Sequence, residues 1–483
     1  MKKIVLLVAA LMVGAFAFQS CEDMDDTDVP VNDFVWKGLN LYYFWKDQVP
    51  DLADDRFSNQ GELNTYLKRF STPEDLFESL LYREDAQRVP QDRFSVIFPD
   101  YRVLENALQG VVKSNGVEYG LIYTDDTQTT LFGYVRYILP GSDAASKDIQ
   151  RGDIFYAVNG TPLTIDNYRG LLGNDTYTLN LANFNGGAIT PNDESVSLTK
   201  SEYSENPVYT VQVITQGSHK IGYLMYNGFY STYDAELNAA FAELASQGVT
   251  DLVLDLRYNS GGSIRTATYL ASMITGQFNG QVFAKQQWNA RLQRYYEQND
   301  PSALTDNFAN SLSNGAAINS LNLSKVYILA TGASASASEL VINSLKPYID
   351  VTVIGAKTVG KNVGSVTLYD SRDFSRRDLK SNYAMQPIVL RIVNKDGFGD
   401  YSTGIAPDVA QPENYDNLGV LGSPDEPLFA RAINLITSQG RMVPMPLKEL
   451  KNFKDSKSIS RFGTEMYLET TPDGSTGLIK DLQ

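Results

Sequence analysis

Three serines separated by alanines lie in the segment TGASASASEL, residues 331–340. The preceding residues are apolar and predict a strand, and apolar positions at helical spacing from Ala337 onward predict a helix that begins near Ser336. At a helix start, free backbone N–H groups and the positive end of the helix dipole favour a developing oxyanion. A serine hydroxyl here is therefore a candidate nucleophile, although serine is also a common N-cap residue.

A lysine in a nearby glycine-punctuated turn is a candidate acceptor for the hydroxyl proton. Residues 351–365 read VTVIGAKTVGKNVGS and place Lys357 and Lys361 after a predicted strand. Burial near apolar strand ends lowers the pKa of a lysine, which is what a general base needs near neutral pH. The alternative is a solvated surface lysine, and this segment alone does not decide between the two.

A third strand end has the glycines that an oxyanion site requires. Residues 251–262 read DLVLDLRYNSGG and end in Gly261 and Gly262. Such a pair lets the backbone approach a ligand closely with its N–H groups exposed. The same four residues, Asn-Ser-Gly-Gly, are also ordinary turn residues. Next to a nucleophile, however, they predict an oxyanion donor.

The chain has a single histidine, His219, and a single cysteine, Cys21. Zinc sites built from these residue types need three or four ligands and are excluded. A carboxylate-only calcium or magnesium site stays open, but no spacing typical of an EF-hand is present. A Ser-His-Asp triad would have to use His219, which lies in a Gln-Gly-Ser-His turn and is expected at the surface. Lysine is left as the base, and we expect no metal or organic cofactor.

Alternating strands and helices must position these segments. From residue 206 to about 440 the pattern predicts an α/β core with at least partly parallel strands. In such folds functional residues gather beyond the carboxyl ends of the strands. The expected strands cover residues 221–226, 252–256, 326–330 and 351–354, and the expected helices cover residues 235–246, 264–274 and 338–345.

Two further units are expected before the core. Residues 33–104 carry aromatic side chains at helical spacing and predict a small helical domain. Residues 105–205 are strand-like, and residues 131–164 within them have an order of strands, turns and a short helix that resembles a PDZ domain. This resemblance implies that an extended peptide binds as an added strand. The alternative is a plain antiparallel barrel. The matching carboxylate loop would consist of Tyr119, Gly120, Leu121 and Ile122.

The beginning of the chain predicts export. Residues 1–20 have the basic start and short apolar run of a secretory signal peptide. The segment FQSC resembles the bacterial lipobox, which implies a lipid anchor on Cys21 in the outer membrane of a Gram-negative bacterium, on the periplasmic side or at the cell surface. Cleavage with Cys21 as a bystander is the alternative. Residues 21–32 predict an acidic linker, and residues 441–483 form a C-terminal extension to which the sequence assigns no function.

The length and the net charge of the chain restrict the classes of protein to which it could belong. A chain of 483 residues is too long for one ordinary domain, and its 43% of apolar residues can form sizeable cores. The 41 Lys and Arg against 57 Asp and Glu give a net charge of -16, which would repel a phosphate backbone. We therefore expect a globular protein that does not bind nucleic acid. Its oligomeric state cannot be predicted from these features.

The three strand-end segments, taken in order, resemble the carboxyl-terminal processing peptidases of serine peptidase family S41. The resemblance extends to DRFS at residues 92–95, to the PDZ-like segment and to GIAPD at residues 404–408, and it covers most of residues 33–440. It implies a ClpP/crotonase-like α/β protease core with mixed sheets and helices. The PDZ-like domain and the N-terminal helical domain would be added to this core.

The family pattern implies roles for individual residues. The nucleophile would be Ser336 and the general base Lys361, and the oxyanion hole would use the backbone N–H groups of Gly262 and Ala337. Several relatives carry a glutamine shortly after the lysine, where this chain reads Asn-Val-Gly-Ser. The residues that could orient the base instead are Thr358 and Ser365.

The implied activity is that of a serine endopeptidase with a Ser/Lys dyad. Its substrates would be proteins or peptides, recognised through their C-terminal tails by the PDZ-like domain. The missing glutamine leaves open a catalytically inactive surface lipoprotein that binds peptides or other ligands on the same fold. A glycan-binding or glycan-cleaving protein would suit the many aromatic residues, but no carboxylate pair can be placed across a glycosidic bond.

Overall fold

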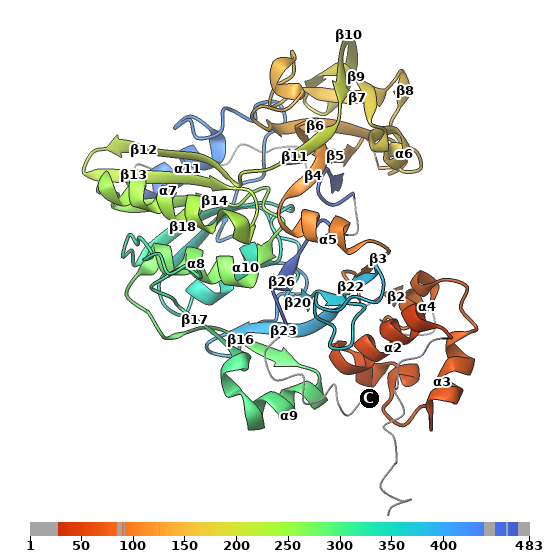
Figure 1. The fold of residues 1–483 in the computed structure, drawn as a ribbon. Helices are drawn as coiled ribbons and strands as arrows, with labels where there is room; N and C mark the ends of the chain where they lie inside the picture. The colour runs from red at the N-terminus through yellow and green to blue at the C-terminus, as the bar shows by residue number, and fades with distance from the viewer. Residues whose placement is uncertain are drawn as a thin grey trace, which may run out of the picture.

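Figure 1 shows the fold in a computed structural model, which describes residues 28–84, 89–90, 92–124, 126–438, 450–459 and 462–471. The predicted signal peptide, Cys21 and part of the C-terminal extension lie outside the described residues. A β-rich domain (top right) and a helical N-terminal unit (lower right) flank a larger α/β core. Within the described ranges, no helix combines the length and the apolar character that a bilayer crossing requires.

The N-terminal unit shares its apolar core with the rest of the molecule. Phe34 and Leu39 of its first helix are buried in the same cluster as Leu254 of the central sheet. This helix begins at Pro30, a residue well suited to a first helical turn, so the linker predicted for residues 21–32 is wrong over its last three positions. The elements of this unit are α2 (Pro30–Tyr42), α3 (Gln60–Leu67), α4 (Pro73–Ser79), β1 (Arg83–Glu84), β2 (Val89–Pro90), β3 (Val96–Phe98) and α5 (Tyr101–Leu108).

The central sheet of the core is mainly parallel. Only its first strand pairs in an antiparallel manner, and each of the four predicted strands is confirmed to within two residues of its expected bounds. Its order is β12 (Val208–Gln216), β13 (His219–Tyr226), β14 (Asp251–Asp255), β18 (Lys325–Ala330), β19 (Asp350–Gly355) and β24 (Val409–Ala410).

Helices cover both faces of this sheet because both faces of its strands are apolar. In β13, Leu224 and Tyr226 pack into the cluster that contains the buried sides of three helices. The alternate residues Tyr223 and Met225 pack against a fourth helix on the other face. The three helices predicted for the core are confirmed to within one residue. They are α7 (Asp234–Ser246), α8 (Ile264–Thr275) and α10 (Ala337–Leu345), and the fourth helix is α11 (Pro427–Ile436).

A second sheet incorporates a strand from the C-terminal extension. That strand, β26, lies parallel to the strand after the Gly261-Gly262 turn on one side and to the strand after Lys361 on the other. The order is β15 (Gly262–Ser263), β26 (Met466–Leu468), β20 (Val363–Val366), β23 (Ile388–Asn394), β16 (Val282–Trp288) and β17 (Thr305–Asn307). A small third sheet joins β21 (Leu368–Tyr369), β22 (Ala384–Gln386) and β3, and α9 (Ala290–Asn299) follows β16.

The β-rich domain, residues 111–204, also receives a strand from the C-terminal extension. Its sheet has the order β10 (Ala188–Thr199), β9 (Thr176–Asn185), β7 (Ile154–Val158), β6 (Leu131–Ile138), β5 (Val117–Tyr123) and β25 (Asn452–Asp455). The helix α6 (Tyr168–Gly173) connects β8 (Thr161–Pro162) with β9, and a separate ladder joins β4 (Val111–Ser114) to β11 (Ser201–Ser204).

The carboxylate loop expected in this domain is not a loop. Residues 119–122 lie inside β5, paired with β6 on one side and reached by β25 on the other. Their backbone groups are therefore occupied by sheet hydrogen bonds and cannot form the nest of free N–H groups that holds a terminal carboxylate. What these residues present to a peptide is a strand edge, and β25 covers it.

Candidate active site

Three strand ends of the core meet at Ser336. The turn after β14 and the turn before α10 are joined because Ala335 N–H and Ser338 Oγ both donate to Asn259 O, at 3.1 and 3.0 Å. The Asn259 side chain shapes its own turn by accepting from Gly261 N–H at 2.9 Å. The fold thus brings the predicted glycine turn against the predicted nucleophile.

Only one of the three serines in the SASAS segment has a hydroxyl without a partner. Ser334 Oγ donates to Leu256 O at 2.8 Å, and Ser338 Oγ is bound to Asn259 as described above. The Ser336 hydroxyl is buried and has no acceptor for its proton among the described residues. A buried hydroxyl without a partner carries a desolvation cost that function can explain.

The backbone at Ser336 is strained. Its φ of 63° and ψ of -115° lie in a region that L-residues rarely adopt, which costs about 1–3 kcal/mol. The next residue, Ala337, is the first residue of α10, so its N–H has no intrahelical acceptor. The hydroxyl and a free N–H are therefore held side by side at the helix start.

Glu339 ties this strained residue to the lysine segment. Its buried carboxylate accepts from the N–H groups of Ser336, Gly360 and Lys361 at 2.8, 2.7 and 2.8 Å, and from Thr358 Oγ1 at 2.5 Å. Burial raises the pKa of the Glu339 carboxyl, and these four donors oppose that rise. One side chain thereby fixes the backbones of the candidate nucleophile and the candidate base relative to each other.

Of the two lysines in the glycine-punctuated turn, only Lys361 is buried. Lys357 is exposed, whereas Lys361 has no exposed surface. Lys361 Nζ lies 4.6 Å from the centre of the Phe94 ring, within the DRFS segment. Burial lowers the pKa of Lys361, and Glu465 on the C-terminal extension partly offsets this by raising it. The amine is therefore in the dry setting that a lysine base requires.

The two hydroxyls predicted to orient the base do not contact its amine. Thr358 Oγ1 donates to Glu339 and accepts from Ile405 N–H at 2.7 Å. Ser365 Oγ donates to Met466 O at 3.2 Å and to Glu465 Oε2 at 3.4 Å. Lys361 Nζ points instead at Thr464 O (2.6 Å) and Glu465 Oε2 (3.3 Å), and the orienting role of the two hydroxyls stays a prediction.

A glutamine that the sequence did not reveal lies next to this group. Gln386, in β22, donates from Nε2 to Ser365 Oγ at 3.0 Å and accepts from Thr367 Oγ1 at 2.6 Å. It is fully buried and comes from a strand 25 positions beyond Lys361 in the chain. Its link to the site runs through Ser365 and Glu465, so no local spacing rule could have identified it.

The predicted oxyanion donor Gly262 follows a glycine that lies against Ser336, and its N–H already has an acceptor. A Cβ placed on the neighbouring Gly261, whose φ is 115°, would lie 2.6 Å from Ser336 Cβ and 3.0 Å from Ser336 Oγ, so only glycine fits there. Gly262 N–H donates to Glu465 O at 2.5 Å. The acceptor is thus a carbonyl of the chain's own C-terminal extension.

Comparison with known proteins agrees with the order of these segments. The model of the peptidase family S41 matches residues 220–410, and the model of the peptidase S41 N-terminal domain matches residues 30–96. The two matches together span more than half of the chain and include Ser336, Lys361 and the DRFS segment. The chain belongs to peptidase family S41.

Two relatives that are named as a protease or peptidase are considerably longer than the region that they share with this S41 chain. A CtpA-like serine protease of Staphylococcus epidermidis is 28% identical over 202 residues, which is 42% of this chain and 36% of the relative. The chloroplastic C-terminal processing peptidase of Tetradesmus obliquus is 24% identical over 282 residues, 56% of this chain and 54% of the relative. The chain therefore matches less than two thirds of the length of these relatives.

Solved structures show the same architecture over most of the S41 chain. An S41 protease from Bacteroides fragilis superimposes with a TM-score of 0.64 at 25% identity, covering 84% of this chain and 98% of that one. The photosystem II D1 C-terminal processing protease shares the fold, with a TM-score of 0.50 at 20% identity over 84% of this chain and 97% of that one. The core, the β-rich domain and the N-terminal unit thus have counterparts in solved proteins.

The single histidine of the S41 chain lies away from this site. His219 begins β13, at the amino end of the parallel strands, whereas Ser336 follows the carboxyl end of β18. Its Nδ1 is 2.8 Å from Asp251 Oδ2, and its side chain is 36% exposed. This agrees with the surface position expected for His219.

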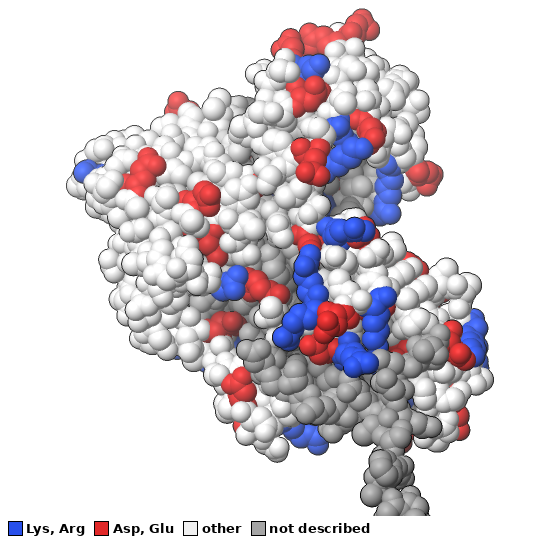
Figure 2. Space-filling model, in the orientation of Figure 1, with Lys and Arg blue, Asp and Glu red and all other residues white. Residues whose placement is uncertain are grey.

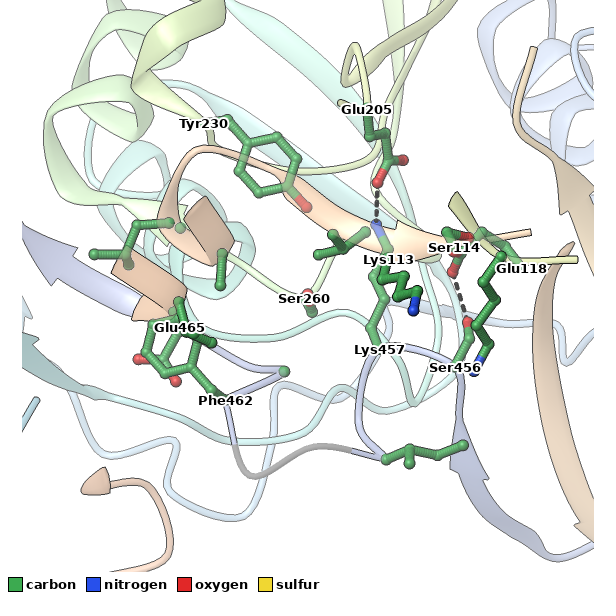
Figure 3. Close-up of a pocket in the computed structure, with 18 of the residues that line it drawn as sticks. Lys113, Ser114, Glu118, Glu205, Tyr230, Ser260, Ser456, Lys457, Phe462 and Glu465 are labelled. Atoms are coloured by element: carbon green, nitrogen blue, oxygen red, sulfur yellow. Dashed lines mark hydrogen bonds and ion pairs between the residues drawn. The ribbon is translucent and has the colours of Figure 1, made fainter. Parts of the chain in front are cut away.

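A cavity of about 470 Å³ leads to the glycine turn (Figure 3). It lies between the β-rich domain and the core, where Glu118 and Glu205 face Ser456 and Lys457 of the C-terminal extension. Figure 2 shows basic and acidic side chains gathered around the hollow on this side of the molecule. Among the described residues, no group of acidic, histidine or cysteine side chains is arranged to hold a metal ion.

Proposed function

We propose that the chain is a serine peptidase in which Ser336 is the nucleophile and Lys361 the general base. The observation that carries this proposal is a buried lysine with a lowered pKa that is linked through its backbone to a strained serine, whose hydroxyl alone among three donates to no described residue. Both residues are fixed by the same carboxylate, Glu339. Such an arrangement suits nucleophilic catalysis better than a purely structural turn.

The reaction would follow the course of acyl transfer. Ser336 Oγ attacks a peptide carbonyl carbon while neutral Lys361 accepts the hydroxyl proton. The backbone N–H groups of Ala337 and Gly262 stabilise the resulting oxyanion. The lysinium then gives its proton to the leaving amine, and water, deprotonated by Lys361, hydrolyses the ester and restores the Ser336 hydroxyl.

The β-rich domain would act as a PDZ-like module that takes protein or peptide substrates as an added strand along β5. Support comes from the exposed edge that β5 offers when β25 is absent, and from the aromatic residues Tyr123 and Tyr168 that face this edge from β5 and α6. Main-chain hydrogen bonds would provide affinity, and the aromatic side chains would select apolar residues of the substrate tail.

We further propose that Cys21 carries a lipid anchor that holds the protein at the outer membrane of a Gram-negative bacterium. The support is the secretory signal with its FQSC end and the absence of any other cysteine in the chain. Metabolic labelling with a fatty-acid analogue should mark the wild-type protein and leave a Cys21→Ala variant unmarked. Labelling of that variant would contradict the anchor.

Proteolysis of an unfolded protein substrate by the purified chain tests the peptidase proposal. Ser336→Ala and Lys361→Ala should each abolish the cleavage that the wild type shows, whereas His219→Ala should retain it. Mass spectrometry of the products would identify the cleaved bonds. Loss of activity in the His219 variant alone would contradict the assignment of the base.

A second candidate function is favoured by the occupied reaction centre. Gly262 N–H and Lys361 Nζ are both bound by the C-terminal extension, as expected of a non-catalytic protein that uses the fold to bind ligands. A serine-directed phosphonate separates the two functions. If the chain is a peptidase, the reagent should label Ser336 in the wild type and leave the Ser336→Ala control unlabelled. If the chain is a binding protein, Ser336 should resist labelling.

A further inference from the structure

The C-terminal segment, defined as residues 450–459 and 462–471, contacts both of the places that a peptide substrate would use. Its first strand, β25, completes the sheet of the β-rich domain. Its second strand, β26, enters the core between β15, which begins with the candidate oxyanion donor, and β20, which follows the candidate base. One continuous piece of chain therefore joins the peptide edge of β5 to the reaction centre.

At the β-rich domain the segment is bound as an added antiparallel strand. Asn452 lies opposite Ile122 and Asp455 lies opposite Gly120 in the strand register. Phe453 packs edge-on against two rings, Tyr123 of β5 and Tyr168 of α6, with centroids 5.2 and 5.0 Å away. The Asp455 carboxylate also accepts a hydrogen bond from Arg136 at 2.7 Å. The side chains of Arg136 and Asp455 are only 10% and 13% exposed. This is the strand-addition mode expected for a substrate tail.

At the reaction centre the segment binds the groups that the reaction needs. Glu465 O accepts from Gly262 N–H, the candidate oxyanion donor. Lys361 Nζ donates to Thr464 O and to the Glu465 carboxylate. Ser336 Oγ makes no hydrogen bond to this amine. Two neighbouring residues of the segment thus bind the amine that the nucleophile would need as its base.

We propose that the C-terminal segment is an intramolecular, substrate-like inhibitor that must leave the reaction centre before a protein substrate can be cleaved. This inference rests on the proposed peptidase function. A tail that served only as structure would not need to engage the oxyanion donor, the base and the peptide edge of β5 together. Extended peptides that carry an aromatic residue for Tyr123 and Tyr168 are the substrates that would compete with it.

The cavities on either side of the segment support a path for such a substrate. The cavity of about 470 Å³ is lined by Ser456, Lys457 and Glu465, and a second of about 430 Å³ is lined by Asp455 and Thr464. Both also reach Ser260, next to the glycine turn. The segment lies between them, and its release would join them beside Ser260 and the glycine turn.

Two variants of the full-length chain release the segment from opposite ends. Phe453→Ala removes the aromatic anchor, which lies away from the reacting atoms, and Glu465→Gln removes the charge that holds Lys361. Loss of two edge-to-face aromatic contacts, or of one hydrogen bond to a charged group, should shift the equilibrium between the docked and the released segment about tenfold or more toward release. Glu194→Gln, an exposed glutamate in β10, is the matched control.

The rate at which a fluorophosphonate labels Ser336 is the measurement, followed by intact-protein mass spectrometry. Both variants should be labelled about tenfold or more faster than the wild type, and Glu194→Gln should match the wild type. A synthetic peptide of residues 450–471 should slow the labelling of Phe453→Ala, while a scrambled peptide should not. Circular dichroism checks the fold of each variant. One folded variant is enough to test the proposal.

The outcomes separate this inference from the peptidase function on which it rests. Unchanged or slower labelling in a folded variant, with clear labelling of the wild type, would overturn the inhibitory role and leave the peptidase intact. Absence of Ser336 labelling in the wild type and in both folded variants would contradict the peptidase function itself.

Discussion

Two fully buried cations, Arg257 and Lys361, lie at the carboxyl edge of the same α/β core. The guanidinium of Arg257 donates to Glu426 at 2.7 and 2.9 Å and to Asp255 at 2.9 Å. Burial alone would lower the pKa of Arg257, but the two carboxylates hold it above its ordinary value. Lys361 has one carboxylate, Glu465, and the net effect of its surroundings is a lowered pKa.

The contrast shows how one core can use buried charge in two ways. A cation that is given a full set of ionised partners stays charged and links distant elements, here β14 and the start of α11. A cation that is left with few partners is biased toward its neutral form and becomes available as a base. Its single carboxylate comes from a segment that we propose can leave.

Lys361→Met should produce the largest change in activity. A positioned general base contributes about 10²–10⁴-fold, so kcat/KM on an unfolded protein substrate should fall by that factor. The unfolding midpoint in urea should also fall, because the Glu465 carboxyl and Thr464 O lose a buried partner, so kcat/KM is compared between folded samples. A variant that retained wild-type kcat/KM would show that Lys361 is not the base.

Glu426→Gln should affect stability and not chemistry. Removal of one partner from a buried ion pair typically costs about 3–5 kcal/mol, since the remaining charge is left incompletely paired. Urea denaturation measures this loss, with Glu194→Gln as the exposed control. The folded variant should keep the phosphonate labelling rate of the wild type. A labelling rate that fell in parallel would mean that the two cations are coupled.

Glu339→Gln should have a smaller effect on the chemistry, in the range of about 10–100-fold on kcat. The carboxylate is a positioning group, and loss of its charge weakens its hydrogen bonds to Ser336 N–H and Lys361 N–H by about 1.5–3 kcal/mol in all. Because substrate contacts are unchanged, KM should change little. A large rise in KM with constant kcat would point to a substrate-binding role instead.

The smallest expected effect is a shift in pH dependence. The base acts in its neutral form, so labelling of Ser336 should rise with pH through the pKa of Lys361. The charged groups that influence Lys361 are Glu465 and Asp92, which raise its pKa, and Arg93, which lowers it. Glu465→Gln therefore removes a carboxylate that raises the pKa of Lys361.

The acid limb of the labelling profile should therefore move to lower pH in Glu465→Gln. In the wild type, burial raises the pKa of the Glu465 carboxyl to about 7, so its charge develops near neutral pH. The difference in labelling rate between the wild type and Glu465→Gln should therefore be greatest above that pH. A profile that moved to higher pH, or did not move, would show that this carboxyl does not control the base.

The fold of the core was predictable because its signals are local. Apolar runs and helical periodicity identified four strands and three helices of the core to within two residues, but not β16, α9 or β17. The loop expected at residues 119–122 followed from the resemblance to a PDZ domain, and the structure places these residues inside a strand, β5. Its pairing with β25 depends on residues more than 300 positions away, which no local pattern reveals.

The candidate site was predictable only in its best-marked parts. Ser336 and Lys361 stand in distinctive segments, whereas Gln386 and Glu465 reach the site through long-range pairing that leaves no trace in spacing. Glu339 did carry a signal, since a glutamate three residues after a helix-start serine commonly binds backbone N–H groups. The C-terminal segment is polar and weakly patterned, and its role emerges only from its contacts.

The most direct test of the account is the phosphonate labelling rate of Ser336 in the wild type, Lys361→Met and His219→Ala, measured at pH 8 by intact-protein mass spectrometry over the same hours. We predict one adduct, on Ser336, that forms at the wild-type rate in His219→Ala and about 10²–10⁴-fold more slowly in Lys361→Met. An equal rate in Lys361→Met, or an adduct on a different residue, would contradict the Ser336–Lys361 dyad.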